Sequence, residues 1–368
     1  MTKKMSINLM ENPGASSEVS MFGEGWSQRI HGLHSRAKLR STLAGRIKNK
    51  AKMKAVMVIL VITFFISCTT NSPQEINEAT DKSLELELSK PADLSNEQIE
   101  DKMSTGYVTV NDQELYYEVH GTGEPLILIC GLSMDLTAHM AYLPILSEQF
   151  QVIIFDNRDA GRSSKAKSPY TIADMAEDTV GLMDALGLES AHVLGGSMGG
   201  TIAQELAIRY PDRVNKLILS ATISKATLTL DSFTTLMKFI KKHDQNNEII
   251  PLMTLLTTMT VSFSENEEMV KQIIGMSKNP PYPQSFDALA RQVEAILGFD
   301  ALDRLPMIKA PTLVLAADQD ILTPPSEARK IEAAIPGAEL QILEGGGHGF
   351  MFEISEKSNK AIIEFLNK

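Results

Sequence analysis

Short apolar segments alternate with longer segments of helical spacing along most of the chain. Apolar residues on consecutive positions are typical of strands buried on both faces of a parallel sheet, and they occur at 125–129, 151–155, 192–195, 214–220, 311–317 and 338–345. Apolar residues at helical spacing occur between and after these runs, at 172–186, 198–209, 326–334 and 350–367. Because strands that alternate with helices form parallel sheets covered on both faces, the pattern predicts an α/β fold.

Two segments depart from this alternation. The runs "YVTV" (107–110) and "ELYYEV" (114–119), with Asn111-Asp112 between them, predict a β-hairpin. Residues 222–297 are apolar at helical spacing without a strand signal, so we expect a helical cap over one end of the sheet. Methionine is adaptable, and the five that fall in this cap predict a tolerant apolar pocket lining: Met237, Met253, Met259, Met269 and Met276. The core domain is then expected at 105–221 and 298–368.

The amino-terminal hundred residues differ from the rest of the chain. Residues 1–52 form a basic leader, and Met53-Lys54 resembles a natural start. The segment 53–68 contains a largely apolar stretch of thirteen residues from Ala55 to Ser67, too short for an ordinary membrane span but suited to a signal peptide. Residues 69–104 are polar and charged, as in a linker.

The signal segment ends in "FISC", which resembles a bacterial lipobox, although Phe65 stands where leucine is usual. This resemblance implies lipidation of Cys68, a lipid anchor in the membrane, and a location in the bacterial cell envelope. The alternative is that residues 55–67 remain uncleaved as an anchor helix.

Charge and cysteine usage exclude two classes of partner. From Thr69 onward the chain holds 24 Lys or Arg (35 less 11) and 43 Asp or Glu (46 less 3), a formal charge of −19. Such an acidic body argues against nucleic acid. The two cysteines, Cys68 and Cys130, form no C-x-x-C pattern, so no metal site is predicted.

The stretch "GGSMG" (195–199) fits the pattern G-x-S-x-G. A predicted strand precedes it and a predicted helix follows, which is the context of a nucleophile on a sharp strand-to-helix turn. Gly195 and Gly199 would let strand and helix meet closely, and the helix amino terminus would favour a developing anion. We therefore predict that Ser197 is a nucleophile.

A serine nucleophile needs a base and an acid that orients the base. His348 lies in the glycine-rich "LEGGGHGF" after the last strand, while Asp318 and Asp320 follow the strand at 311–317. The loop after 214–220, "SATISK", contains no carboxylate. Among the other histidines, His139 follows the first parallel strand and could approach a pocket rim.

From about Gly106 to Lys368 the chain resembles the α/β-hydrolase superfamily, in its capped serine esterase type. "FDNRDAGRSS" (155–164) is similar to the segment after the fourth strand in methyl-esterase-like and haloperoxidase-like members. "FDALDRLPMIKAPTLVLAADQDILTP" (299–324) and "GGGHGF" (345–350) look like the family's acid and histidine loops, and this alignment makes Asp320 the acid. The resemblance also assigns the oxyanion hole to the amides of Leu132 and Met198. Cys130 replaces the family's usual histidine before Gly131, and we expect a buried, inert thiol.

The resemblance implies hydrolysis of a carboxylic ester of a small to medium apolar substrate through an acyl-enzyme, with neither metal nor cofactor. A C–C bond hydrolase or a perhydrolase with the same triad remains an alternative, as does a non-catalytic binding protein on this fold. Aspartyl-nucleophile dehalogenases and epoxide hydrolases are disfavoured because Ser197 occupies the nucleophile position. Proline iminopeptidases need acidic cap groups, and "SENEEM" (264–269) looks like a solvated turn.

Overall fold

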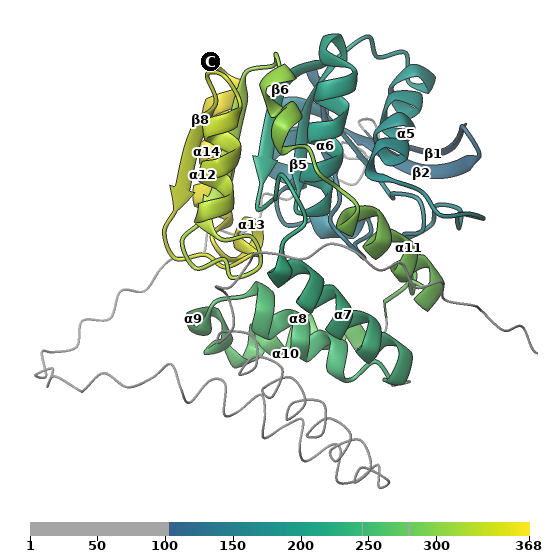
Figure 1. The fold of residues 1–368 in the computed structure, drawn as a ribbon, viewed down its shortest axis with the longest axis vertical. Coiled ribbons are helices and arrows are strands. Elements are labelled where there is room, and N and C mark those ends of the chain that lie inside the picture. The colour runs from purple at the N-terminus through teal and green to yellow at the C-terminus, as the bar shows by residue number, and fades with distance from the viewer. Residues whose placement is uncertain (1–102, 245, 279) are drawn as a thin grey trace, which may run out of the picture. The chain divides into compact units, whose positions relative to one another are not determined.

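The computed structural model describes residues 103–368 except 245 and 279, and a mostly parallel eight-stranded sheet forms its centre (Figure 1). The strand order is β1-β2-β4-β3-β5-β6-β7-β8; β1 and β2 form an antiparallel hairpin, β2 pairs antiparallel with β4, and the others pair in parallel. The strands are β1 (Met103–Val110), β2 (Gln113–His120), β3 (Glu124–Ile129), β4 (Phe150–Phe155), β5 (Ala191–Gly196), β6 (Val214–Ser220), β7 (Thr312–Ala317) and β8 (Glu339–Leu343). The predicted α/β fold and hairpin are confirmed.

Helices cover both faces of the sheet, as alternate residues of β3 show. Ile127 and Ile129 belong to one apolar cluster, which also holds residues of α5 (Ile172–Ala185), α6 (Met198–Arg209) and α12 (Pro325–Ala334). Leu126 and Leu128 belong to a second cluster, with residues of α4 (Leu143–Ser147) and α14 (Ser355–Leu366). The helix expected at 350–367 is interrupted at Ile354, so that α13 (Phe350–Glu353) precedes α14.

Five helices lie between β6 and β7 and form the cap: α7 (Leu228–His243), α8 (Ile249–Thr258), α9 (Val261–Ser264), α10 (Glu267–Lys278) and α11 (Phe286–Leu297). Figure 1 shows α7 to α10 gathered at one end of the sheet. The cap has a small core of its own, built by Met237, Ile240, Met253, Leu289 and Val293. Leu132 of the loop after β3 packs against this core, while Leu230, Ala295 and Ile296 of the cap join the first of the two clusters that flank the sheet.

Three short 3₁₀ helices complete the connections, at Leu136–His139, Pro211–Arg213 and Leu302–Met307. The predicted leader (1–52), the signal segment (53–68) with Cys68, and the linker up to residue 102 lie outside the described residues. Residues 103 and 104, expected in the linker, are the first two of β1. Within the part of the chain that is described, no helix is both long and apolar enough to cross a membrane.

Candidate active site

Ser197 lies at the junction of β5 and α6, where the backbone makes a strained turn. Its φ is +53° and its ψ is −118°, a conformation that residues with a side chain rarely adopt. A Cβ on Gly195 would lie 2.2 Å from the Gly199 carbonyl oxygen, and one on Gly199 would lie 2.0 Å from the Ile129 oxygen. Only glycine fits at both positions, so the predicted reason for these two residues is confirmed.

Ser197, His348 and Asp320 form one hydrogen-bonded chain. The Oγ of Ser197 lies 3.1 Å from Nε2 of His348, and Nδ1 of the same ring lies 2.9 Å from Oδ2 of Asp320. A carboxylate only accepts, so the Nδ1–H donates to Asp320 and Nε2 is left to accept from the serine hydroxyl. The structure thus brings together three side chains that the sequence spreads over 152 positions.

Asp320 is buried and saturated with donors. Its Oδ1 accepts from the amides of Leu322 (2.8 Å) and Thr323 (2.9 Å), and its Oδ2 also accepts from the Thr323 hydroxyl (2.6 Å). Burial alone would raise the pKa of Asp320, but the His348 ring and the Thr323 donors outweigh it and hold the pKa below the ordinary 3.8. An ionised carboxylate at this position can orient the imidazole and stabilise its protonated form.

The other candidates have different surroundings. Asp318 is exposed and accepts from the Gly345 amide (2.8 Å), so it does not reach His348. His139 is buried, bonded to Cys130 Sγ (3.0 Å) and the Tyr142 hydroxyl, and it does not line the cavity. Burial lowers the pKa of His139 to about 3. The Cys130 thiol is itself buried, and burial raises its pKa well above the usual value, as expected for an inert thiol.

The amides predicted to bind an oxyanion belong to Leu132 and Met198. Met198 is the first residue of α6, where an N–H has no acceptor inside the helix. Leu132 lies in the loop after β3 and lines the cavity beside Gly131. Among the described residues neither amide donates a hydrogen bond to a carbonyl or side chain. Two unengaged N–H groups therefore lie in the segments that adjoin Ser197 and Gly131.

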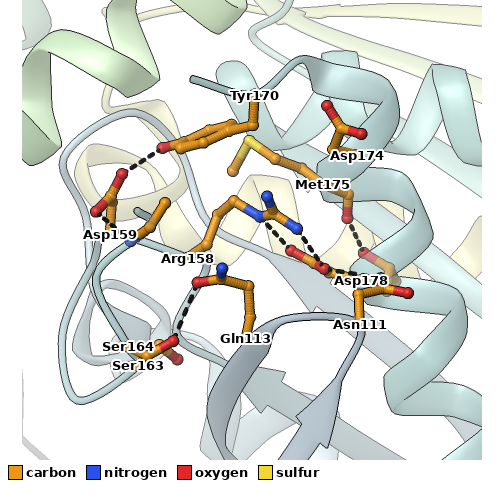
Figure 2. A network of polar contacts seen from close by, with 12 residues as sticks. Asn111, Gln113, Arg158, Asp159, Ser163, Ser164, Tyr170, Asp174, Met175 and Asp178 are labelled. Carbon is orange, nitrogen blue, oxygen red and sulfur yellow. Dashed lines mark hydrogen bonds and ion pairs between the residues drawn. The ribbon is translucent and has the colours of Figure 1, made fainter. Parts of the chain in front are cut away.

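The loop after β4 is held by a network of charged side chains (Figure 2). Arg158 donates to both oxygens of Asp178 (2.6 and 2.7 Å), and the Tyr170 hydroxyl donates to Asp159 (2.9 Å). Arg158 is buried and does not line the cavity. Arg158 thus fixes the loop against α5 and has no contact with the cavity.

Two adjacent residues of α11, which the sequence did not single out, tie the cap to the loops after β3 and β4. Arg291 donates to both oxygens of the fully buried Asp159 (2.7 and 2.8 Å). Gln292 is also fully buried; its Oε1 accepts from the Ser133 amide (3.0 Å) and its Nε2 donates to the Arg158 carbonyl (3.0 Å). One signal was available, because Gln292 interrupts the apolar face of a strongly amphipathic helix.

A cavity of about 300 Å³ opens between these loops and the cap, and Ser197 and His348 lie in its wall. Most of the wall is apolar, formed by Leu132, Met134, Leu230, Phe233, Met237, Ile250, Leu289, Ile296 and Leu322. Of the cap methionines named above, Met237 lines the cavity, while Met253 packs in the cap core. The volume suits a small ligand, at the lower end of the usual range for binding pockets.

Metal-ligating side chains do not cluster in the described part of the chain, where no group of three or more His, Cys, Asp or Glu could hold an ion.

Residues 124–353 match the family model described as the alpha/beta hydrolase fold. The chain belongs to this family. The α/β-hydrolase framework accounts for the position of Ser197 on the turn after β5, of Asp320 after β7 and of His348 after β8.

Similar proteins in this family are named for different activities. The chain is 32% identical to the "Putative carbamate hydrolase RutD" of Caulobacter sp. (strain K31), over 69% of this chain and 96% of that protein. It is 30% identical to the poly(3-hydroxyalkanoate) depolymerase of Ectopseudomonas oleovorans, over 66% and 84%. The crystal structure of the enol-lactonase from Burkholderia xenovorans LB400 superposes with a TM-score of 0.65 at 27% identity, covering 72% of this chain and all of that one. The family is thus a hydrolase family with more than one kind of substrate.

Proposed function

We propose that this α/β-hydrolase cleaves carboxylic esters through an acyl-enzyme formed on Ser197. The observation that carries the proposal is the unbroken chain from Asp320 through His348 to Ser197, which reaches the wall of a mostly apolar cavity. Such a chain activates a hydroxyl that is otherwise a weak nucleophile at neutral pH.

In the first half of the reaction, Ser197 Oγ forms a bond to the ester carbonyl carbon while its proton passes to Nε2 of His348. The carbonyl π electrons move onto the oxygen, and the amides of Leu132 and Met198 would donate to this oxyanion. When the tetrahedral adduct collapses, the bond to the alkoxide breaks and the alkoxide takes the proton from His348. Asp320 stabilises the imidazolium that forms in between.

In the second half, water replaces the alcohol. His348 takes a proton from the water, the resulting oxygen attacks the acyl carbon, and collapse returns the proton to Ser197 with release of the acid. The chemistry would serve equally for an ester, a lactone or a carbamate. The apolar walls favour a small to medium apolar acyl or alcohol portion.

The proposal is tested by covalent labelling of the full chain with a fluorophosphonate probe. We expect one adduct on the Ser197 peptide, and none with Ser197→Ala or His348→Ala. Ser262→Ala is the control, because Ser262 is exposed on α9 and does not line the cavity. This control should be labelled at the wild-type rate.

Two further outcomes separate the alternatives. A folded protein that resists the probe would contradict the proposal and support a binding protein on the same fold. If labelling succeeds, a panel of p-nitrophenyl esters of two to eight acyl carbons, with a carbamate, a C–C cleavage substrate and a peroxide assay beside it, would distinguish ester hydrolysis from the C–C hydrolase and perhydrolase alternatives.

We also propose that Cys68 is lipidated and holds the enzyme at the bacterial cell envelope. The support is the "FISC" motif after the apolar segment 55–67. Metabolic labelling with an alkyne fatty acid in a bacterial host should mark the wild type and not Cys68→Ala. An unlabelled wild type of uncleaved mass would favour the alternative of an anchor helix.

A further inference from the structure

We propose that Lys241 forms an anion-binding subsite at the end of the cavity remote from Ser197, so that the preferred substrate is an ester that carries a carboxylate away from the scissile bond. The inference rests on the proposed function and names the substrate class for it. Its support comes from the course of the cavity along α7, the charges in its wall and the donors beside Lys241.

The cavity runs along one face of α7. Leu230, Phe233, Met237 and Lys241 all line it, at spacings of three, four and four residues, which place side chains on one side of a helix. Leu230 lies in the first turn of α7, after a loop whose Thr222 hydroxyl donates to the Ser197 carbonyl (2.7 Å), whereas Lys241 lies in the last turn of the helix. At 1.5 Å per residue, the two positions are about 16 Å apart.

The charge of Lys241 is not balanced by the protein in the described part of the chain. Lys241 is the one Lys or Arg among the described residues of the cavity wall, and no described carboxylate lies within 4.0 Å of its ammonium group. The arginines near the site differ, because Arg158 and Arg291 are paired with Asp178 and Asp159.

The acid in the wall, Asp135, forms no ion pair with Lys241 within 4.0 Å, and its carboxylate accepts from the Thr137 amide instead. Lys241 is only half-buried, yet the walls that continue from it toward the serine are apolar. A carboxylate that entered along these walls would gain more from the ammonium group than it would in open water.

A second donor lies at the same end of the cavity. Asn247 and Ser277 line the cavity together with Lys241, and the Asn247 side chain donates to the Ser277 carbonyl (2.6 Å). This bond ties the end of α10 to the turn between α7 and α8. The Ser277 hydroxyl makes no hydrogen bond to another described side chain or carbonyl, so it is available to donate to an anion. An ammonium group and a hydroxyl in the wall of one cavity suit the two oxygens of a carboxylate.

The length of the substrate follows from the helix geometry. A helical side chain leans toward the amino terminus, so Lys241 extends back toward Met237, and its ammonium group lies about 10 Å along the helix from Leu230. An extended chain of roughly eight carbons covers this distance. The preferred substrate is therefore an ester of a dicarboxylic acid, or of a hydroxy acid, of about this length.

The test uses the full chain and two matched pairs of substrates. In the first pair, p-nitrophenyl hydrogen suberate is compared with p-nitrophenyl methyl suberate, which lacks only the charge. In the second pair, 8-acetoxyoctanoate is compared with its methyl ester, which places the carboxylate on the alcohol side. We expect at least a tenfold preference in kcat/KM for the charged member of one pair, mainly through KM.

Charge variants assign the preference to the lysine. Lys241→Met should abolish the preference and Lys241→Glu should reverse it. Lys242→Glu is the control, because the neighbouring Lys242 is exposed and does not line the cavity, and it should leave the preference at the wild-type value. High salt should weaken the preference in the wild type and, equally, in Lys242→Glu.

A wild type without preference in both pairs, or a preference that survives Lys241→Met, overturns the inference. A failure of the proposed function is distinguished by the fluorophosphonate label on Ser197. If the enzyme is not labelled and hydrolyses neither pair, calorimetric titration with suberate still decides the matter, because the subsite predicts binding that is lost in Lys241→Met and kept in Lys242→Glu.

Discussion

The loop after β3 and the loop that carries His348 flank the same serine, but the cap holds them by different kinds of contact. The first loop meets buried side chains, since Gln292 of α11 accepts from its Ser133 amide. The second meets mostly backbone, since the Gly349 amide donates to the Thr258 carbonyl at the end of α8 (2.7 Å).

The loop after β3 is also held by buried side chains outside the cap. Cys130 bonds through its thiol to His139, and its carbonyl accepts from the Asn157 side chain (3.1 Å). All three side chains are buried. The geometry of the proposed oxyanion donor Leu132 therefore depends on several buried polar groups, each of which has few alternative partners.

The loop that carries His348 depends on one partly buried carboxylate. Glu353 accepts from the Gly347 amide (2.6 Å) and from the Thr260 amide of the cap. The bond between Gly349 and Thr258, in contrast, joins two backbone groups and survives most side-chain changes. We therefore expect single substitutions to disturb the contacts between α11 and the loops after β3 and β4 strongly. The contacts between the cap and the loop that carries His348 should be disturbed less.

The largest effect is expected from Arg291→Ala. The change leaves the fully buried Asp159 with only the Tyr170 hydroxyl and the Ala166 amide as partners. Breaking a buried pair on one side costs about 3 kcal/mol of the free energy of unfolding. Urea unfolding measures this loss. Lys225→Ala, which breaks an exposed pair with Asp300, is the control and should change little.

The next effect is expected from Gln292→Leu, which keeps the volume but removes the bonds to Ser133 and Arg158. If Gln292 positions the oxyanion loop, kcat falls about 100-fold, comparable to the loss of one oxyanion donor, while KM changes little. Affinity for a boronic acid, which forms a tetrahedral adduct, should fall in parallel. A rise in KM at constant kcat would show instead that Gln292 acts only on substrate binding.

His139, which lies beneath the loop after β3, should make the free energy of unfolding depend on pH. Burial holds the pKa of His139 near 3 in the folded protein, below the ordinary 6.5, so the unfolded chain binds an extra proton between these values. Stability from this group is complete above pH 6.5 and is lost as the pH falls toward 3. Between pH 7 and pH 5 the wild type should lose about 2 kcal/mol more than His139→Gln, measured by urea unfolding at each pH. Parallel curves for the two proteins would contradict the assignment.

The smallest effect is expected from Glu353→Gln. The amide oxygen can still accept one of the two N–H bonds, so the free energy of unfolding should fall by only about 1 kcal/mol and kcat by a few-fold. Thermal unfolding and steady-state kinetics measure the two quantities. A fall in kcat larger than that caused by Gln292→Leu would contradict the expectation that the contacts of the histidine loop are the more tolerant ones.

The sequence predicted those parts of the fold and site that follow from local patterns. Runs of consecutive apolar residues predicted β3 to β8, and the glycines around Ser197 predicted the strand-to-helix turn. Both predictions succeeded because strands and turns depend mainly on residues that are close together in the chain. The order of serine, acid and histidine followed from the strand that each one succeeds. The break of the last helix at Ile354 was not predicted, because the apolar spacing continues through it.

Contacts between the cap and the catalytic loops could not be predicted in this way. Gln292 and Ser133 are 159 positions apart, and Arg291 and Asp159 are 132 apart. Which polar side chain of a helix meets which loop depends on how the helix is rotated and placed, and no periodicity records this. The chain by itself therefore determined the sheet, the strand-to-helix turn at Ser197 and the order of the candidate serine, acid and histidine, while the choice of Asp320 over Asp318 came from the family resemblance. Only the tertiary structure decided that Arg291 and Gln292 secure the loops and that Lys241 lines the far end of the cavity, because packing of distant segments brings these groups together.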